Sequence, residues 1–239
     1  MLGAILTIGN EIVSGDVPNT NATWLAQRLE SIGVRVVLAA AVPDEIETIA
    51  ALVRREHGLV DRMIVTGGLG GTPDDITREA IALAFGVGQE EVRALAADLR
   101  ARFPRHPDYA ARWAFLPAGS RPLTNPQGGA PGFSIANIWV LPGLPSEMES
   151  MFEHYADELR GVGAIVAWRS AYKTRESDIV QVLAGATVRW PQVKVGSYPR
   201  FLKGGPEVEI VLKSTDEAAL AEAVAWIEPA LAEATGAAR

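Results

Sequence analysis

The sequence predicts an α/β domain with a mostly parallel sheet covered by helices on both faces, followed by a small α+β domain. Three observations predict this fold. Apolar strand-like runs alternate with helix-like runs as far as Gly161. The strand-like runs are apolar along their whole length, as burial on both faces of a parallel sheet requires. Beyond Gly161 the alternation changes to a βαββα pattern, so we expect domains at residues 1–165 and 166–239.

The elements of the first domain can be justified in chain order. We expect strand 3–9, helix 19–33, strand 34–42, helix 44–58, strand 61–66, helix 75–86, helix 89–103, strand 134–143 and helix 146–160. In the first helix Trp24, Leu25 and Leu29 have helical spacing, and Gly33 suits the C-terminal cap. The second helix has acids in its first turn and basic residues in its last, which matches the helix dipole. Pro145 suits the first turn of the last helix, where a missing N–H costs little.

The remaining segments are less regular. Residues 104–132 are rich in Pro and Gly, and we expect a long irregular stretch there. The second domain is expected to consist of strand 164–174, helix 175–187, strands 192–200 and 207–215, and helix 216–235.

Composition limits the classes of function. The 239 residues include no cysteine and three histidines, so disulfides and thiolate zinc sites are excluded, and a metal would sit among oxygen ligands. The formal net charge of −7 disfavours nucleic acid as a partner. The apolar N-terminus lacks a basic segment, so we interpret it as a strand and not as a signal peptide. No apolar run is long enough for a membrane span, and a cytoplasmic protein is expected.

A glycine-rich junction, "GGLGGTPDD" (67–75), lies between a predicted strand and a predicted helix. Glycines before a helix N-terminus bring backbone N–H groups close to a phosphate. The carboxylates of Asp74 and Asp75 would repel that phosphate unless a metal ion bridged them. The alternative is a tight turn in which Asp75 caps the helix and Asp74 is solvated. The junction is neither a GxGxxG motif nor a Walker A loop.

Two other junctions carry polar groups. In "GNEIVSGDVPNTN" (9–21), Glu11, Ser14, Asp16, Asn19, Thr20 and Asn21 could hold a ribose, a pterin or a metal. Asn19 or Asn21 could equally cap the following helix. In "LPGLPSEMESMF", Gly143 follows a strand, and Ser146 and Glu149 have the S-x-x-E spacing of a capping box.

These junctions should meet at one edge of the sheet. Ligands of open parallel sheets bind beyond the carboxyl ends of the strands. We therefore expect one cleft lined by the loops that contain Asn10–Glu11, Asp44, Gly67–Asp75 and Gly143–Ser146.

Four stretches carry a family resemblance: "TIGNEIVSGDVPNTNATWLAQRLESIGV", "TGGLGGTPDDITREA", "NPQGGAPGF" and "VLPGLPSEM", all within residues 7–152. They resemble, in the same order, the characteristic stretches of the competence/damage-inducible protein A (CinA) family. That family is similar to the molybdopterin-binding proteins MoaB, MogA and gephyrin. The tail resembles the family's small KH-like domain, and we expect the separate C-terminal amidohydrolase domain of longer members to be missing.

The resemblance implies a molybdopterin-binding fold and metal-dependent pyrophosphatase activity on ADP-ribose or a related dinucleotide such as FAD. A non-catalytic molybdopterin- or nucleotide-binding protein of molybdenum cofactor biosynthesis is the alternative, and a homo-oligomer is possible. The implied catalytic pair is Asp74 and Asp75, and the metal (Mg, Mn or Co) would be held by Asp75, Asp44 and Glu11. The implied ligand-binding residues are Asn10, Glu11, Ser14, Asn21, Thr66, Gly67, Gly68, Gly70, Thr72, Gly143 and Ser146.

The sequence departs from the family pattern at three positions. Gly71 stands where we expect proline, Gly129 where we expect threonine, and Trp113 where we expect glutamine. These departures bear on substrate identity more than on fold.

Overall fold

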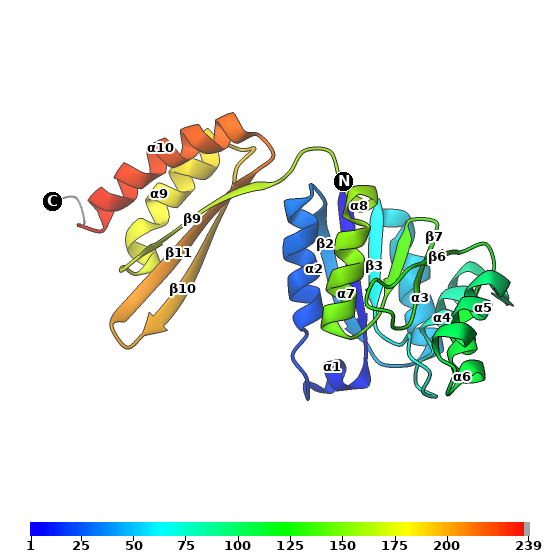
Figure 1. Ribbon diagram of the computed structural model, residues 1–239. Helices are drawn as coiled ribbons and strands as arrows, with labels where there is room; N and C mark the ends of the chain where they lie inside the picture. The colour runs from blue at the N-terminus through cyan, green and yellow to red at the C-terminus, as the bar shows by residue number, and fades with distance from the viewer. Residues whose placement is uncertain (237–239) are drawn as a thin grey trace. The chain divides into compact units, whose positions relative to one another are not determined.

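The computed structural model describes residues 1–236, which divide into two compact units, with the boundary between Val162 and Gly163 (Figure 1). Each unit has its own sheet and its own buried apolar cluster. Within residues 1–236, no helix combines the length and the apolar character needed to cross a bilayer.

The first unit is built on a six-stranded sheet with the order β2-β1-β3-β8-β7-β6. Four neighbouring strands are parallel: β2 (Arg35–Val42), β1 (Leu2–Ile8), β3 (Arg62–Thr66) and β8 (Ile138–Leu141). The other two, β7 (Gly132–Ile135) and β6 (Arg121–Leu123), join by antiparallel pairing, β7 with β8 and β6 with β7. The fold class expected for this part of the chain is confirmed.

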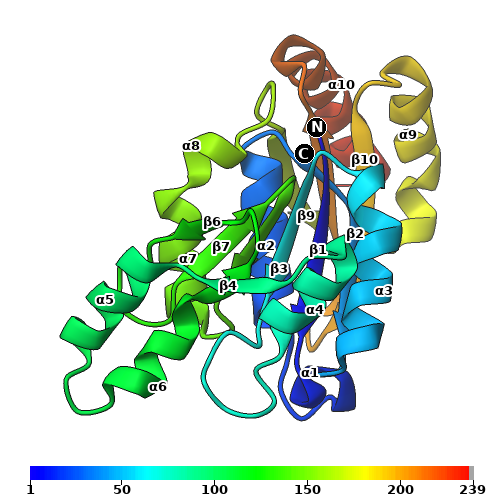
Figure 2. The same ribbon diagram turned by 90° about the vertical axis from the view of Figure 1, so that its right-hand side faces the viewer.

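Helices cover both faces of this sheet (Figures 1 and 2). Those that pack on the two faces are α2 (Thr20–Ser31), α3 (Ile46–Glu56), α4 (Thr77–Phe85) and α7 (Pro145–His154). Alternate residues of β1 point to opposite faces, because side chains alternate along a strand. Leu6 is buried with Ile49 of α3 and Ile81 of α4, whereas Ile5 is buried with residues of α2 and α7.

Eight further elements complete the first unit. They are α1 (Asn10–Ser14), η1 (His57–Leu59), β4 (Gln89–Glu91), α5 (Arg93–Arg102), α6 (Pro107–Ala111), η2 (Arg112–Ala114), β5 (Phe115–Pro117) and α8 (Ala156–Leu159). The expectation of an irregular stretch at 104–132 is therefore wrong, because α6, β5 and β6 all lie in it. The expected helix 89–103 is also partly wrong, since its first residues form β4, which pairs with β5.

The expected single strand 134–143 is a hairpin. Strands β7 and β8 are antiparallel and turn at Ala136 and Asn137, where Ala136 has a φ of 50°. The amide Nδ2 of Asn137 donates to the carbonyls of His57 (2.7 Å) and Val60 (2.8 Å). These contacts attach the turn to the segment before β3, so that β8 continues the parallel part of the sheet.

The second unit has a three-stranded antiparallel sheet with the order β10-β11-β9. Its elements are β9 (Val166–Tyr172), α9 (Glu176–Arg189), β10 (Lys194–Leu202), β11 (Gly205–Ser214) and α10 (Glu217–Ala234). Val208, Ile210 and Leu212 alternate along β11 and are buried under α9 and α10, which lie on one face of the sheet (Figure 1). The α+β character of this unit is as expected, and its three strands form a sheet of their own instead of joining the six-stranded sheet.

Candidate functional site

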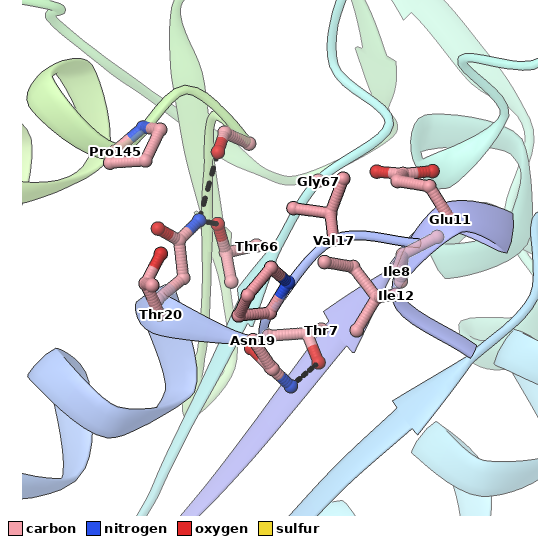
Figure 3. A pocket seen from close by; sticks show the side chains of 13 residues that line it. Thr7, Ile8, Glu11, Ile12, Val17, Asn19, Thr20, Thr66, Gly67 and Pro145 are labelled. Atoms are coloured by element: carbon pink, nitrogen blue, oxygen red, sulfur yellow. Dashed lines mark hydrogen bonds between the residues drawn. The ribbon is translucent and has the colours of Figure 1, made fainter. Parts of the chain in front are cut away.

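A cavity of about 120 Å³ lies at the carboxyl ends of β1 and β3 (Figure 3). Its lining comes from the end of β1, from α1 and the start of α2, from the end of β3, and from the connection between β8 and α7. Among the lining residues are Thr7, Glu11, Asn21, Thr66, Gly67 and Gly143. Three of the expected loops therefore meet at this cavity, as the parallel strands require.

The glycine loop begins with a backbone conformation that only glycine adopts easily. Gly67 has a φ of 110°, and a Cβ on it would lie 2.2 Å from the carbonyl oxygen of Ile8. Its N–H donates to the carbonyl of Leu141 (3.2 Å). The Thr77 hydroxyl donates back to the Gly67 carbonyl (2.8 Å). The loop is thus pressed between β1, β8 and the first turn of α4.

Asp75 closes the glycine loop upon itself. One carboxylate oxygen accepts the N–H of Gly70 (2.8 Å), and the other accepts the N–H (2.8 Å) and the hydroxyl (2.5 Å) of Thr72. The helix α4 starts at Thr77, so the alternative in which Asp75 is its N-cap is wrong. While Asp75 holds the N–H groups of Gly70 and Thr72, a phosphate must use other donors of the loop.

Asp74 lies next to this closure but is exposed to solvent. The neighbouring Thr72 side chain is the main cause that lowers the pKa of Asp74, and a hydrogen bond from its own backbone adds to it. Asp74 is therefore an anion that faces solvent at the tip of the loop.

A buried arginine, which the sequence analysis missed, supports the loop from beneath. Arg78 donates from its guanidinium to the carbonyls of Leu69 (2.5 Å) and Gly70 (3.4 Å). Burial lowers its pKa to about 10, so it remains charged at neutral pH. The signal was present in the sequence: Arg78 shares a helix face with Ile81 and Ala82, and a charge on a buried face requires partners.

Asp44 and Asn10 bind each other across two loops. The Asn10 N–H donates to Oδ2 of Asp44 (2.8 Å), and the Asp44 N–H donates to Oδ1 of Asn10 (3.3 Å). Burial is the main cause that raises the pKa of Asp44, the Asn10 bond opposes it, and the charges of Glu11, Asp74 and Asp75 raise it further. Four carboxylates from three loops therefore share one electrostatic environment. Within residues 1–236, however, no three acidic or histidine side chains gather closely enough to hold a metal by themselves.

Two asparagines build the opposite side of the cavity. Asn19 caps α2 by accepting the N–H of Ala22 (3.1 Å), as one of the two interpretations expected, and its Nδ2 donates to the Thr7 hydroxyl (2.7 Å; Figure 3). Asn21 donates from Nδ2 to the Gly143 carbonyl (2.8 Å) and to the Thr66 hydroxyl (3.3 Å). Its Oδ1 is buried, with no hydrogen-bond partner among the residues that the structure describes.

Several of the expected site residues lie outside the lining of the cavity: Asn10, Ser14, Gly68, Gly70, Thr72 and Ser146, as well as Asp44, Asp74 and Asp75. The Ser14 hydroxyl donates to Asp16 (2.6 Å), and the carbonyl of Ser146 accepts from Gln127 (2.6 Å). The expected capping box of Ser146 and Glu149 is wrong. Pro145 already occupies the first turn of α7, the N-cap is Leu144, and no side chain caps the helix.

Neighbouring side chains fill the space at two of the three departures from the family pattern. A Cβ on Gly71 would lie 2.4 Å from the ring of Tyr109, which in turn packs against Trp113 with ring centroids 5.8 Å apart. A Cβ on Gly129 would lie 2.3 Å from Oε1 of Glu147, whose Oε2 accepts a hydrogen bond from the Asn125 amide (2.9 Å). Gly71 and Trp113 are thus linked through Tyr109.

Known proteins resemble this chain in sequence over both units. Residues 4–161 match the family described as a probable molybdopterin binding domain, and residues 170–237 match the middle domain of FAD synthase. A CinA-like protein of Frankia casuarinae is 36% identical over 99% of the chain. The chain is a CinA-like member of the molybdopterin-binding domain family. It spans 59% of the length of the Frankia protein, and 85% of that of an Archaeoglobus fulgidus protein that is 35% identical.

A solved CinA structure also resembles the first unit. The crystal structure of the protein CinA from Thermoplasma acidophilum is 29% identical, with a TM-score of 0.63. The match covers 66% of this CinA-like chain and 97% of that one. Three of the four stretches quoted from the sequence, at residues 7–34, 66–80 and 140–148, supply the lining of the cavity and the glycine loop, whereas the stretch 125–133 lies outside the lining.

Proposed function

We propose that this edge of the sheet binds the diphosphate of a nucleotide or pterin, and that the protein hydrolyses such a diphosphate with a divalent metal, with ADP-ribose or a related dinucleotide as substrate. The observation that carries the proposal is the placing of the glycine loop, where a phosphate would bind, beside the carboxylates of Asp44, Glu11, Asp74 and Asp75. A diphosphate alone would be repelled by these charges, and a cation between them removes the repulsion.

The donor set fits a metal that is shared with the ligand. Mg²⁺ is usually bound by one or two carboxylates, with water and substrate phosphate oxygens completing its octahedron. Of the expected ligands, Asp44 and Glu11 would hold the metal from the loops after β2 and β1, while Asp75 keeps the glycine loop closed. When bound, the metal would neutralise charge that develops on the phosphate and lower the pKa of an attacking water.

The protein's own groups have separate roles in this proposal. The free N–H groups of the loop and the charge of Arg78 beneath it attract the phosphate. Asp75 keeps the loop closed, and a neighbouring cation would favour the charged form of Asp44, whose pKa is raised by burial. Asn21 aligns the loop with Gly143 on the far side of the cavity.

Hydrolysis of ADP-ribose and FAD, with and without Mg²⁺, Mn²⁺ or Co²⁺, tests the catalytic part. We expect metal-dependent release of the two monophosphates. Asp44→Asn should lose most of this activity and still fold, because the amide oxygen of Asn can accept the Asn10 N–H. Asp75→Asn is a poorer test, since an amide cannot accept all three bonds that close the loop. An exposed acid that lies outside the cavity lining, changed by Glu90→Gln, is the matched control.

The alternative function is binding without chemistry, in molybdenum cofactor biosynthesis. The acidic group separates the two, because a site that only binds an anion does not need four carboxylates nearby. Tight diphosphate binding with no metal-dependent hydrolysis of any diphosphate tested would reject catalysis and leave this alternative.

A further inference from the structure

A second hollow, of about 440 Å³, adjoins the cavity on the side of α2 and α7. The two share Pro18, Asn19 and Thr20 in their linings. The side chains of the second hollow with distinctive chemistry are Trp24 and Gln27 of α2 and Glu149 of α7. We call this hollow the α2–α7 groove.

The size of the first cavity requires its ligand to extend elsewhere. At about 120 Å³ it can take a phosphate-sized group, whereas pockets for whole organic ligands usually measure about 300–1,000 Å³. Glu11 stands at one side of the cavity, and Thr20 and Pro145 at the other (Figure 3). The side of Glu11 is the acidic one, so the organic part of the ligand has its room on the side of Thr20, where the groove begins.

Trp24 offers the groove an aromatic surface held in a fixed position. It is partly exposed, and its ring packs edge-on against the buried Phe152, with centroids 5.4 Å apart and planes at 89°. Any heteroaromatic ring can stack on such a surface, because every such ring has a π-face. An inorganic phosphate or pyrophosphate has no such face and gains nothing from it.

Glu149 and Gln27 provide polar groups that the protein itself does not use. Within residues 1–236 neither side chain has a hydrogen bond or an ion pair. Glu149 is free because the capping box predicted for it does not form. A carboxylate only accepts hydrogen bonds, so its natural partner in a ligand is a donor such as a ring amino group.

We propose that the α2–α7 groove is a ring subsite, in which a heteroaromatic ring with an amino group stacks on Trp24 and donates to Glu149. The inference rests on the proposed diphosphate site and narrows its ligands to compounds in which such a ring is attached to the diphosphate. It assigns ring specificity to α2 and α7, and phosphate and metal binding to the loops after β1, β2 and β3.

Calorimetric titration of the full chain with three probes and Mg²⁺ tests this: ADP, N6,N6-dimethyl-ADP, whose amino nitrogen cannot donate, and pyrophosphate. ADP should bind about tenfold more tightly than the dimethyl compound, as expected for about 1.4 kcal/mol from one bond to a charged acceptor. It should bind more tightly still than pyrophosphate, which lacks the ring. Stacking on Trp24 should also quench part of the tryptophan fluorescence.

Variants separate the two contacts. Glu149→Ala, at the surface, should lower the affinity for ADP to that for the dimethyl compound, while Glu90→Ala, outside both hollows, should change nothing. Trp24→Leu should weaken both nucleotides about tenfold or more, abolish the quenching and leave pyrophosphate unaffected. Its melting temperature must be checked, because Trp24 also packs on Phe152.

Two outcomes would overturn the ring subsite. If pyrophosphate and ADP bind equally and Glu149→Ala has no effect, the groove takes no ring, although the diphosphate site still stands. If pyrophosphate does not bind at all, the diphosphate site fails, and the ring subsite fails with it.

Discussion

Gly67→Ala should destabilise the first unit by an amount that the loop geometry allows us to work out. The φ of 110° is a conformation that costs a residue with a side chain about 1–3 kcal/mol. The new Cβ would also lie 2.2 Å from the carbonyl oxygen of Ile8, at the end of a central strand that cannot swing aside. Overpacking of this kind costs about 1–3 kcal/mol. The expected loss in the free energy of unfolding is thus about 2–6 kcal/mol.

Gly15→Ala is the matched control for this prediction. Gly15 also has a positive φ, 83°, but a Cβ there would meet nothing within 4 Å. It should lose only the backbone cost of about 1–2 kcal/mol. Urea unfolding compares the two variants, and hydrogen exchange at β1 and β3 assigns the loss to the first unit. Equal urea midpoints for the two variants would mean that the loop relaxes away from β1. The close approach at Gly67 would then add nothing to the cost of a side chain at this position.

Two further predictions concern charged side chains beside the loop. The pKa of Asp44 is raised in the folded protein, so its charged form is disfavoured there. Asp44→Asn should therefore raise the melting temperature at pH 7. The gain should vanish below the ordinary pKa of 3.8, where Asp44 is protonated in both the folded and the unfolded protein. A gain that persists at pH 3 would contradict this cause. Arg78→Met should leave the carbonyls of Leu69 and Gly70 without their donor and cost about 1–3 kcal/mol in thermal unfolding, while pyrophosphate binding weakens. Unchanged pyrophosphate affinity in a folded Arg78→Met protein would refute a role for this charge.

Much of the fold could be predicted because its signals are local. The strands up to Thr66 are apolar runs between helices with clear periodicity, and parallel strands necessarily bring their following loops to one edge. The β7–β8 turn could not be predicted from local signals, because it is held by hydrogen bonds from Asn137 to the carbonyls of His57 and Val60. Both partners are far away in sequence. Strand β4 was missed for a similar reason, since the polar residues 89–91 form a strand only by pairing with β5.

The site was predicted in outline and not in its internal contacts. The sequence placed Asp75 either at a helix cap or on a metal, and the structure shows a third role in which it closes the loop. That role depends on where α4 starts, and the start of a helix is among the least certain features of a sequence prediction. The S-x-x-E spacing predicts a capping box of Ser146 and Glu149, but α7 begins at Pro145, so Ser146 already lies inside the helix and cannot be its N-cap.

The bonds of Asn21 have a consequence for the order in which the protein folds. Asn21 and Gly143 are 122 positions apart in the chain, and Thr66 and Pro142 are 76 apart. Contacts of such separation form late, because a long loop must first be closed. A nascent chain that has already paired β1, β2 and β3 still lacks the part of the cavity wall that Gly143 and Pro145 form, and it gains that part only when β8 joins the sheet. A ligand that binds here therefore stabilises the completed first unit and none of the folding intermediates that precede it.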